Sequence, residues 1–398
     1  MGDCLLSLNA GSSSLKFALF RQAGNGTLEP LLRGQLKTST TEVHLQASRT
    51  HGGPLTGMSW SAGQGGDVLR LLQWIRTTAG GGEIAAVGHR IVHGGGKFTQ
   101  PVIATADIIA RIQAITPLAP LHQPLGLAPL IELRGDEPEL TQVCCFDTAF
   151  HHGLAPPVSR YGIPREWELA GIRRYGFHGL SYQSIVDQLS DHWPELAAGR
   201  VVVAHLGSGA SLCALSNCKS MDTTMGFSAL DGLLMGTRPG SIDPGVILHL
   251  LRSGLSTDDL EHLLYHESGL LGVSGISSDI RDLLASDAPS AREAVELFVF
   301  RSARETAALA ATLGGLDGIV FTGGIGEHNS TIRQMVSDRL GWLGVRVDPE
   351  ANAAGLQIVS QAQSSVRVMA LATDEEKVIA RSCSAALEER QHPNGPEG

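Results

Sequence analysis

Two arginines and a histidine lie in glycine-rich stretches of this sequence. Arg90 ends an apolar run in EIAAVGHRIVHGGG, Arg238 lies in the loop MGTRPGSIDPG, and His178 lies in RYGFHGLS. Each has a structural alternative, because arginines often form surface ion pairs and a lone histidine beside aromatic residues often belongs to the core. If all three point into one cleft, they can instead neutralise a carboxylate or a phosphoryl group during transfer.

Two carboxylates could complete such a site. Asp147 interrupts an apolar strand in QVCCFDTAF, and a buried carboxylate requires a partner. That partner could be Mg²⁺ on bound phosphates or a salt bridge, and the sequence leaves both open. Glu375 follows Asp374 at the start of a predicted helix, where helix capping also accounts for acidic residues.

Three glycine turns predict a phosphate-binding site. LSLNAGSSSLKFAL and VVVAHLGSGASLCAL each read as strand, Gly-Ser-rich turn and strand, and FTGGIGE ends a third apolar run in a glycine turn. Such turns offer backbone N–H donors and no obstructing side chain, as a triphosphate requires. The first stretch lacks the Walker spacing, so Lys16 alone does not identify a phosphate site. Three unrelated loops are the alternative.

Alternating strands and helices position these residues and predict an α/β fold. We expect a buried strand over 84–92, a helix from about Leu125, a helix from Ala291 that ends at Gly-Gly, and a helix that starts at Asp374. The repeated strand–turn–strand pattern predicts two similar halves.

The expected domain division follows from these elements. The first domain spans residues 1–150, and the C-terminal helix, at about 378–390, packs back onto it. The second domain spans 151–377, with the nucleotide in the cleft between the two. The polar stretch 391–398 is expected to be a disordered tail.

The composition argues against several classes of protein. The chain has 398 residues and a net charge of −10, so neither nucleic acid nor an anionic membrane is expected as the main partner. We find no signal-peptide pattern and no apolar run long enough to span a bilayer. The 6 cysteines have no metal-ligand spacing, so reduced thiols and a cytoplasmic location are expected.

A series of motifs covers essentially the whole chain: LLSLNAGSSSLK, GHRIVHGG, APLHQP, FDTAFH, YGFHGLS, VVVAHLGSGAS, MDTTMGF, MGTRPGSIDPG, SGISSDIRD, FTGGIGE and TDEE. In content and order they resemble the acetate kinases. The resemblance implies the ribonuclease H-like fold of actin, Hsp70 and sugar kinases, with two similar domains and an interdomain active-site cleft. It also implies a homodimer that transfers a phosphoryl group directly and reversibly from ATP to acetate, giving acetyl phosphate and ADP, with Mg²⁺ or, in its place, Mn²⁺.

The resemblance also implies roles for individual residues. Catalysis falls to four residues: Arg90, Asp147, His178 and Arg238. Metal binding falls to Asn9 and Glu375, with Asp147 in support. The acyl group meets one arginine and several apolar side chains: Arg90, Val92, Leu121, Phe177 and Ala229. Phosphates and adenosine meet residues of the glycine motifs and of one further loop: Ser12, Ser14, Lys16, His205, Gly207, Ser208, Gly209, Asp279, Ile280, Arg281, Gly323, Gly324, Ile325 and Gly326.

Nine positions depart from the family pattern: Leu180, Tyr182, Ser208, Cys218, Ala229, Asp231, Pro239, Ser241 and His328. Ser208 stands where an asparagine is usual, Cys218 where a glycine is usual, and Ala229 where proline is usual. A smaller Ala229 predicts a pocket that could admit propionate, since one methylene is worth about 1–3 kcal/mol in such a pocket. Two further alternatives are a kinase disabled by Ser208 and an ATP-binding switch of the actin or Hsp70 type.

Overall fold

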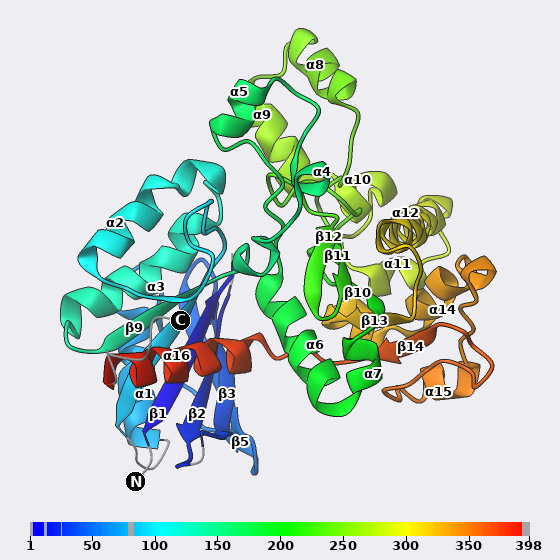
Figure 1. Cartoon of the computed structure of the whole chain (residues 1–398). Helices are drawn as coiled ribbons and strands as arrows, with labels where there is room; N and C mark the ends of the chain where they lie inside the picture. The colour runs from blue at the N-terminus through cyan, green and yellow to red at the C-terminus, as the bar shows by residue number, and fades with distance from the viewer. Residues whose placement is uncertain (1–2, 12–13, 25, 79–82, 392–398) are drawn as a thin grey trace. The chain divides into compact units, whose positions relative to one another are not determined.

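Two mixed β-sheets, one in each of two units of the chain, form the framework of the protein (Figure 1). The computed structural model describes residues 3–11, 14–24, 26–78 and 83–391. Unit 1 comprises Met1–Phe150 and Asp374–Gly398, and unit 2 comprises His151–Thr373. Among the described residues, no helix combines the length and the apolar character that crossing a membrane requires.

The two sheets share the order and direction of five strands. In unit 1 the order is β3 (Leu28–Thr38), β2 (Ser14–Gln22), β1 (Cys4–Ala10), β7 (Ile84–Ile91) and β9 (Thr141–Phe146). In unit 2 it is β12 (Lys219–Thr223), β11 (Ala210–Ser216), β10 (Arg200–Leu206), β13 (Gly318–Thr322) and β14 (Arg367–Ala370). In both, the first three strands are antiparallel and the remaining pairs are parallel. The prediction of two similar α/β halves is confirmed.

Helices cover both faces of the sheet in unit 1. On one face, α16 (Glu375–Gln391) packs against β1, β2, β7 and β9, as Figure 1 shows. A Cβ at Gly88 would lie 2.3 Å from Ile379 of α16, so a glycine is needed for this close approach. On the other face, α1 (Asp67–Thr78) and α3 (Gln123–Asp136) pack together, and Leu71, Leu133 and Phe17 share a core there. The remaining elements are β4 (Glu42–Arg49), β5 (Pro54–Leu55), β6 (Ser59–Ser61), β8 (Val102–Ile103) and α2 (Ala106–Ala114).

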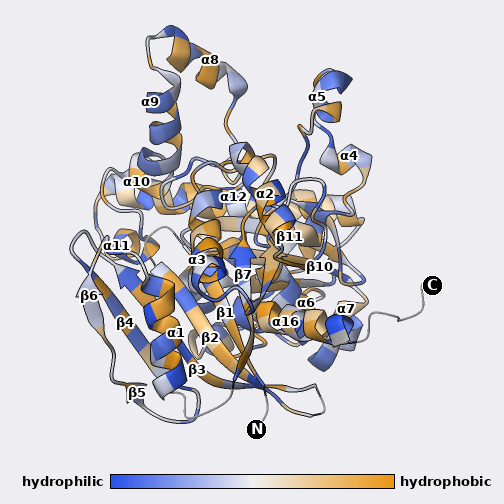
Figure 2. Ribbon diagram, turned by 90° about the vertical axis from the view of Figure 1, so that its left-hand side faces the viewer, coloured by the Kyte–Doolittle hydropathy of each residue, from blue (hydrophilic) through white to orange (hydrophobic). Residues whose placement is uncertain are grey.

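In unit 2, α6 (Gly179–His192) packs against β10, and α12 (Pro289–Leu313) packs against β10, β11 and β12. Four helices lie away from this sheet in both views: α4 (Pro156–Ser159), α5 (Arg165–Leu169), α8 (Pro244–Arg252) and α9 (Thr257–His262) (Figures 1 and 2). The mostly apolar α8 has no buried residue. The other helices are α7 (Pro194–Ala197), α10 (Gly269–Ser274), α11 (Ile280–Leu284), α13 (Gly323–His328), α14 (Ser330–Asp338) and α15 (Pro349–Ala353).

Some predicted elements differ from the structure at their ends. The helix expected from Ala291 begins at Pro289, because proline is favourable in the first turn. The helix expected at Asp374 begins one residue later, and the carboxylate of Asp374 accepts a hydrogen bond from Lys377 N at 3.0 Å as a cap. Asp147 follows β9 instead of interrupting it.

The third glycine motif does not form the turn that we expected. Its residues form α13, which starts directly after β13. Gly323 has a φ of +75°, and this left-handed conformation lets the chain turn sharply from the strand into the helix. The expected disordered tail falls on residues 392–398, outside the described residues, except for Gln391 at the end of α16.

Candidate active site

Arg90 and Asp147 form the centre of the candidate site in unit 1. They lie at the carboxyl ends of β7 and β9, which are parallel neighbours. Arg90 Nε and Nη2 donate hydrogen bonds to Asp147 Oδ2 at 2.9 and 2.6 Å. Asp147 is 1% exposed, and its buried Oδ1 atom has no hydrogen-bond partner among the described residues. Because an unpartnered buried carboxylate oxygen is costly, Oδ1 is a candidate ligand atom.

Asn9 connects Arg90 to the start of α16. Its Oδ1 accepts a hydrogen bond from Arg90 Nη1 at 3.2 Å, and its Nδ2 donates to Glu375 Oε2 at 2.9 Å. Burial raises the pKa of Glu375, Arg90 lowers it, and Asp147 raises it further. Burial would lower the pKa of Arg90, but the surrounding carboxylates raise it overall. The buried Asp147 and the half-buried Glu375 therefore outnumber the Arg90 guanidinium at this point.

This surplus of carboxylates fits a divalent cation. Within the ranges that the structure describes, no three His, Cys, Asp or Glu side chains come together as a metal-binding group. Mg²⁺ does not need one, because it is usually held by one or two carboxylates together with substrate phosphates and water. Asp147 Oδ1 and the Glu375 carboxylate can supply these oxygens. Asn9, the other predicted metal residue, bonds Arg90 and Glu375 through its amide.

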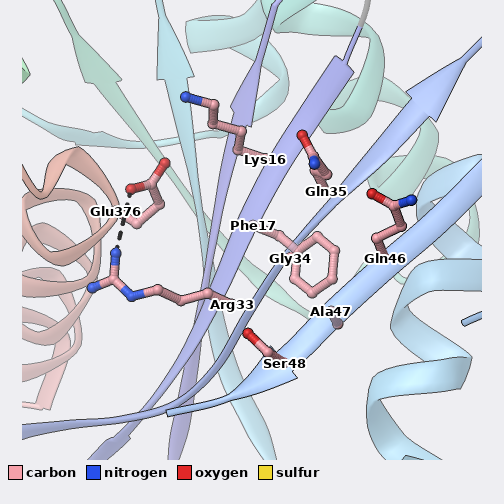
Figure 3. A pocket seen from close by; sticks show the side chains of 9 residues that line it. All are labelled: Lys16, Phe17, Arg33, Gly34, Gln35, Gln46, Ala47, Ser48 and Glu376. Atoms are coloured by element: carbon pink, nitrogen blue, oxygen red, sulfur yellow. Dashed lines mark ion pairs between the residues drawn. The ribbon is translucent and has the colours of Figure 1, made fainter. Parts of the chain in front are cut away.

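Arg33 of β3 holds the first turn of α16 (Figure 3). Its guanidinium forms ion pairs with Asp374 and, at 3.8 Å, with Glu376, and these two residues flank Glu375 in the sequence. Arg33, Glu376 and Lys16 line a pocket of about 470 Å³, in which the Lys16 side chain extends away from Arg33. Lys16 is exposed and forms no ion pair with another described residue.

In unit 2, His178 precedes α6 in an unusual backbone conformation. Its φ of 58° and ψ of 25° lie in the left-handed region, which is uncommon outside glycine and is often found at functional sites. Its Nδ1 lies 2.9 Å from Ser211 Oγ, and its ring stacks on His205 with the centroids 4.3 Å apart. His205 Nδ1 lies 2.8 Å from Ser181 Oγ.

Arg238 and His178 converge on the second glycine turn, Gly207–Gly209. A Cβ on Gly209 would lie 2.8 Å from Arg238 Nη2 and 3.3 Å from His178 Nε2. Arg238 Nη1 donates to the Ala229 carbonyl at 2.8 Å, and burial lowers the pKa of Arg238. In the part of the chain that the structure describes, no carboxylate forms an ion pair with Arg238. An enclosed guanidinium with unused donors is suited to bind an anion.

The second and third glycine motifs lie side by side because β10 and β13 are parallel neighbours. A Cβ on Gly207 would lie 3.9 Å from Gly324 N, and a Cβ on Gly323 would lie 2.8 Å from the Leu206 carbonyl oxygen. Gly207, Ser208 and Gly209 form the β10–β11 turn, and Gly323, Gly324, Ile325 and Gly326 belong to α13. A side chain at Gly209 or Gly323 would therefore be crowded, whereas a Cβ on Gly324 would meet nothing within 4 Å. At these glycine positions the backbone is not covered by a side chain, as the phosphate-binding interpretation requires.

The remaining residues predicted to bind the nucleotide lie at the start of α11 and near the first glycine turn. Asp279 caps α11 and forms an ion pair with Arg281, with 2.5 Å between Oδ2 and Nη2, whereas Ile280 is buried. Their contact with adenosine stays a prediction. Ser12 lies outside the described residues, and Ser14 is half-buried at the start of β2.

The four predicted acyl-binding residues other than Arg90 belong to both units. Val92 is buried and Leu121 is 39% exposed in unit 1, whereas Phe177 is buried and Ala229 half-buried in unit 2. Their common role around an acyl group stays a prediction.

Several residues near the candidate site escaped the sequence prediction. Ser211 lies opposite His205 in the β10–β11 register, and Tyr182 follows His178 by one helical turn, so strand alternation and helical spacing could have indicated both. Arg33 contacts residues more than 300 positions away in the sequence, and no local pattern signals it.

Comparisons with known proteins place the chain among carboxylate kinases. The model of the Acetokinase family matches residues 4–381. An acetate kinase of Rhodopseudomonas palustris (strain TIE-1) is 50% identical, over 96% of this chain and 98% of that protein. The crystal structure of Porphyromonas gingivalis acetate kinase is 33% identical with a TM-score of 0.85, covering 97% of this chain and 100% of that one. A propionate kinase from Francisella tularensis is 35% identical with a TM-score of 0.87, covering 96% and 98%.

Proposed function

The chain belongs to the acetokinase family, and we propose that it transfers the γ-phosphoryl group of ATP reversibly to acetate, giving acetyl phosphate and ADP. The observation that carries this proposal is Arg238, a largely enclosed guanidinium beside His178 and the glycine turn with no carboxylate partner among the described residues. Such a group can bind the negative charge of a carboxylate or of a phosphoryl group.

The reaction needs little from the protein beyond positioning and charge. An acetate oxygen, ionised near pH 7, attacks the γ-phosphorus, and the bond from that phosphorus to the oxygen it shares with the β-phosphate breaks. No general base is required, whereas a sugar hydroxyl would need one. We assign Arg238 and Arg90 to the charges of the acyl carboxylate and the phosphoryl group, and Nε2 of His178 to a phosphoryl oxygen.

Mg²⁺ fits the carboxylates of unit 1. Asp147 Oδ1 and Glu375 would hold it, and Asn9 would keep Glu375 in place through its 2.9 Å hydrogen bond. When bound, the ion neutralises charge on the nucleotide phosphates. We further propose that Lys16, Gly207, Ser208, Gly209 and α13 contact these phosphates, and that Asp279, Ile280 and Arg281 contact the adenosine.

The acyl specificity is the finer part of the proposal. The Ala229 carbonyl accepts a hydrogen bond from Arg238, which connects this residue to the proposed anion site. Because its side chain is small, propionate is a second candidate substrate. One similar protein is itself named a propionate kinase. An assay of ADP formation with acetate, propionate and butyrate tests both candidates. Turnover with acetate at a rate at or above that with propionate supports the proposal. ATP binding without turnover of any acid would overturn it in favour of an ATP-binding switch.

We also propose that the chain forms a homodimer through its projecting helices. On α8, Val246 is 41% and Leu248 is 50% exposed, and on α5 Trp167 is 51% exposed. Exposed apolar side chains on helices that lie away from the sheet favour burial against a second copy of the chain. Light scattering should give twice the chain mass, and Leu248→Glu should shift the protein to the monomer. A monomeric wild type would contradict the proposal.

A further inference from the structure

The two stacked histidines of unit 2 are held in the same way. His178 Nδ1 lies 2.9 Å from the hydroxyl of Ser211, and His205 Nδ1 lies 2.8 Å from the hydroxyl of Ser181. Both serines are fully buried, at 0% exposure. The rings lie nearly parallel, with an interplanar angle of 24°. Each imidazole thus has one nitrogen engaged by an enclosed hydroxyl.

We propose that Ser211 and Ser181 are positioning residues that fix the tautomer of His178 and His205. By donating to Nδ1, they leave the proton on Nε2 and direct both Nε2–H groups along the Gly207–Gly209 turn. There the two neutral imidazoles donate hydrogen bonds to oxygens of a bound phosphoryl group. This inference rests on the proposed function, which supplies that group.

Tyr182 sets the direction of the hydrogen bonds to His178. Its hydroxyl lies 2.5 Å from Ser211 Oγ, and the side chain is 0% exposed. Burial raises the pKa of Tyr182 well above its ordinary value, so the phenol keeps its proton. A phenol is a stronger acid than an aliphatic hydroxyl and is therefore the better donor of the two. With Tyr182 donating to Ser211, the hydrogen of Ser211 is directed to His178 Nδ1.

The Nε2 atoms lie where the proposal needs them. A Cβ on Gly209 would lie 3.3 Å from His178 Nε2, and a Cβ on Gly207 would lie 3.8 Å from His205 Nε2. Both nitrogens therefore lie on the side of the glycine turn where the Cβ atoms of Gly207 and Gly209 would be. A molecule that lies along this turn meets both N–H groups.

The surrounding charges favour neutral rings. The titratable groups around His178 include His205, which stacks on it, Arg238, whose Nη2 approaches the same Gly209 position, and Tyr182 behind Ser211. His151 packs edge-on against Tyr182, and burial lowers the pKa of His151 to about 4. A second positive charge beside Arg238 is unfavourable. A neutral imidazole with its proton on Nε2 remains a donor without that charge.

The tautomers can be read directly from ¹⁵N NMR of the full chain labelled at histidine, without substrate, at about pH 8. We expect His178 and His205 to carry the proton on Nε2, with the signals of His178 identified by their loss in His178→Gln. In Ser211→Ala, the His178 signals should shift toward a mixture of both tautomers. Ser216→Ala, at the far end of β11, is the matched control and should leave them unchanged.

Measurements of kcat then test whether the tautomer of His178 matters for phosphoryl transfer. Ser211→Ala should lower kcat about tenfold with KM nearly unchanged, as loss of one orienting hydrogen bond implies, and Tyr182→Phe should lower it less. Because an imidazolium donates from both nitrogens, the ratio of wild-type to Ser211→Ala kcat should narrow as the pH falls and His178 becomes protonated. A purely structural role would leave this ratio constant.

The outcomes separate this inference from the proposed function. A wild type that phosphorylates no carboxylate refutes the function, whatever the NMR result. An active wild type whose His178 carries its proton on Nδ1, or is charged at about pH 8, refutes the inference. So does a Ser211→Ala variant with wild-type kcat and pH profile. If Ser211→Ala fails to fold, Tyr182→Phe answers the same question through the same two measurements.

Discussion

Arg90 and Arg238 carry the same charge in opposite surroundings. Arg90 donates two hydrogen bonds to the buried Asp147, and further carboxylates lie nearby. Arg238 has a carbonyl, two histidines and a glycine turn around it, and no carboxylate partner among the described residues. Arg90 is thus surrounded by carboxylates, whereas Arg238 faces a glycine turn and can bind an anion.

From this contrast we infer that unit 1 binds a cation and unit 2 binds an anion. Mg²⁺ neutralises the excess negative charge of the carboxylates around Arg90. An anion such as a carboxylate or a phosphoryl group neutralises the Arg238 guanidinium. An ATP-dependent carboxylate kinase uses both. The two arginines should therefore respond differently to removal.

Arg238→Ala should cause the largest loss of activity with little loss of stability. Removal of a preorganised charge donor lowers kcat by about 10²–10³-fold, while the fold loses one hydrogen bond to the Ala229 carbonyl and a charge that no described carboxylate pairs. The measurements are kcat with acetate and the melting temperature. Arg238→Lys should recover part of kcat, because it restores the charge without the two-pronged geometry. A variant that melts well below the wild type would show that Arg238 has a structural partner after all.

Arg90→Ala should destabilise unit 1 as well as lower kcat. It leaves the Asp147 carboxylate buried at 1% exposure without its guanidinium, and breaking a buried pair in this way costs about 3–5 kcal/mol. Urea unfolding should detect this loss. The double variant Arg90→Gln with Asp147→Asn removes both charges of the pair and should recover most of the stability. A double variant as unstable as Arg90→Ala would contradict the pairing.

The sequence predicts these two arginines better than it predicts their surroundings. Strand alternation and the register of β10 and β11 place His205 opposite Ser211, so this part of the cluster follows from local rules. The ion pairs of Arg33 with Asp374 and Glu376 do not, because they join strand and helix across the whole chain. Whether an arginine forms an ion pair depends on such long-range contacts. For Arg90 and Arg238, residue types alone therefore could not decide between an ion pair and an anion-binding role.

Mg²⁺ should stabilise the protein more at high pH than at low pH. Burial raises the folded-state pKa of Glu375 above its unfolded value, so the metal-free protein loses stability as the pH rises from the unfolded pKa through the raised folded pKa. Mg²⁺ favours the charged carboxylate and offsets this loss. The increase in melting temperature on adding Mg²⁺ should therefore be larger at about pH 8 than at about pH 5.5.

A matched pair of variants checks the origin of this effect. Glu375→Gln should remove most of the pH dependence of the Mg²⁺ shift, whereas Glu29→Gln, on an exposed part of β3, should leave it unchanged. An equal Mg²⁺ shift at both pH values in the wild type would argue that Glu375 does not hold the ion.

The smallest effect is expected at Ser208, although the glycine turn that contains it lies beside Arg238. The Ser208 side chain is exposed, and the turn is held by backbone hydrogen bonds, from Gly236 N to the Ser208 carbonyl at 3.1 Å and from Gly207 N to the Gly209 carbonyl at 3.1 Å. Ser208→Asn should thus change kcat/KM by less than about fivefold, or about 1 kcal/mol.

The neighbouring position gives the contrast for this test. Gly209→Ala should abolish most activity, because the added Cβ would lie 2.8 Å from Arg238 Nη2 and 3.3 Å from His178 Nε2. Phosphate binding by this turn then depends on its backbone and on the groups that converge there, not on the side chain at 208. If Ser208→Asn instead raises kcat/KM by two orders of magnitude or more, the wild type is a kinase disabled at this turn, and the unpaired Arg238 is a remnant of its site.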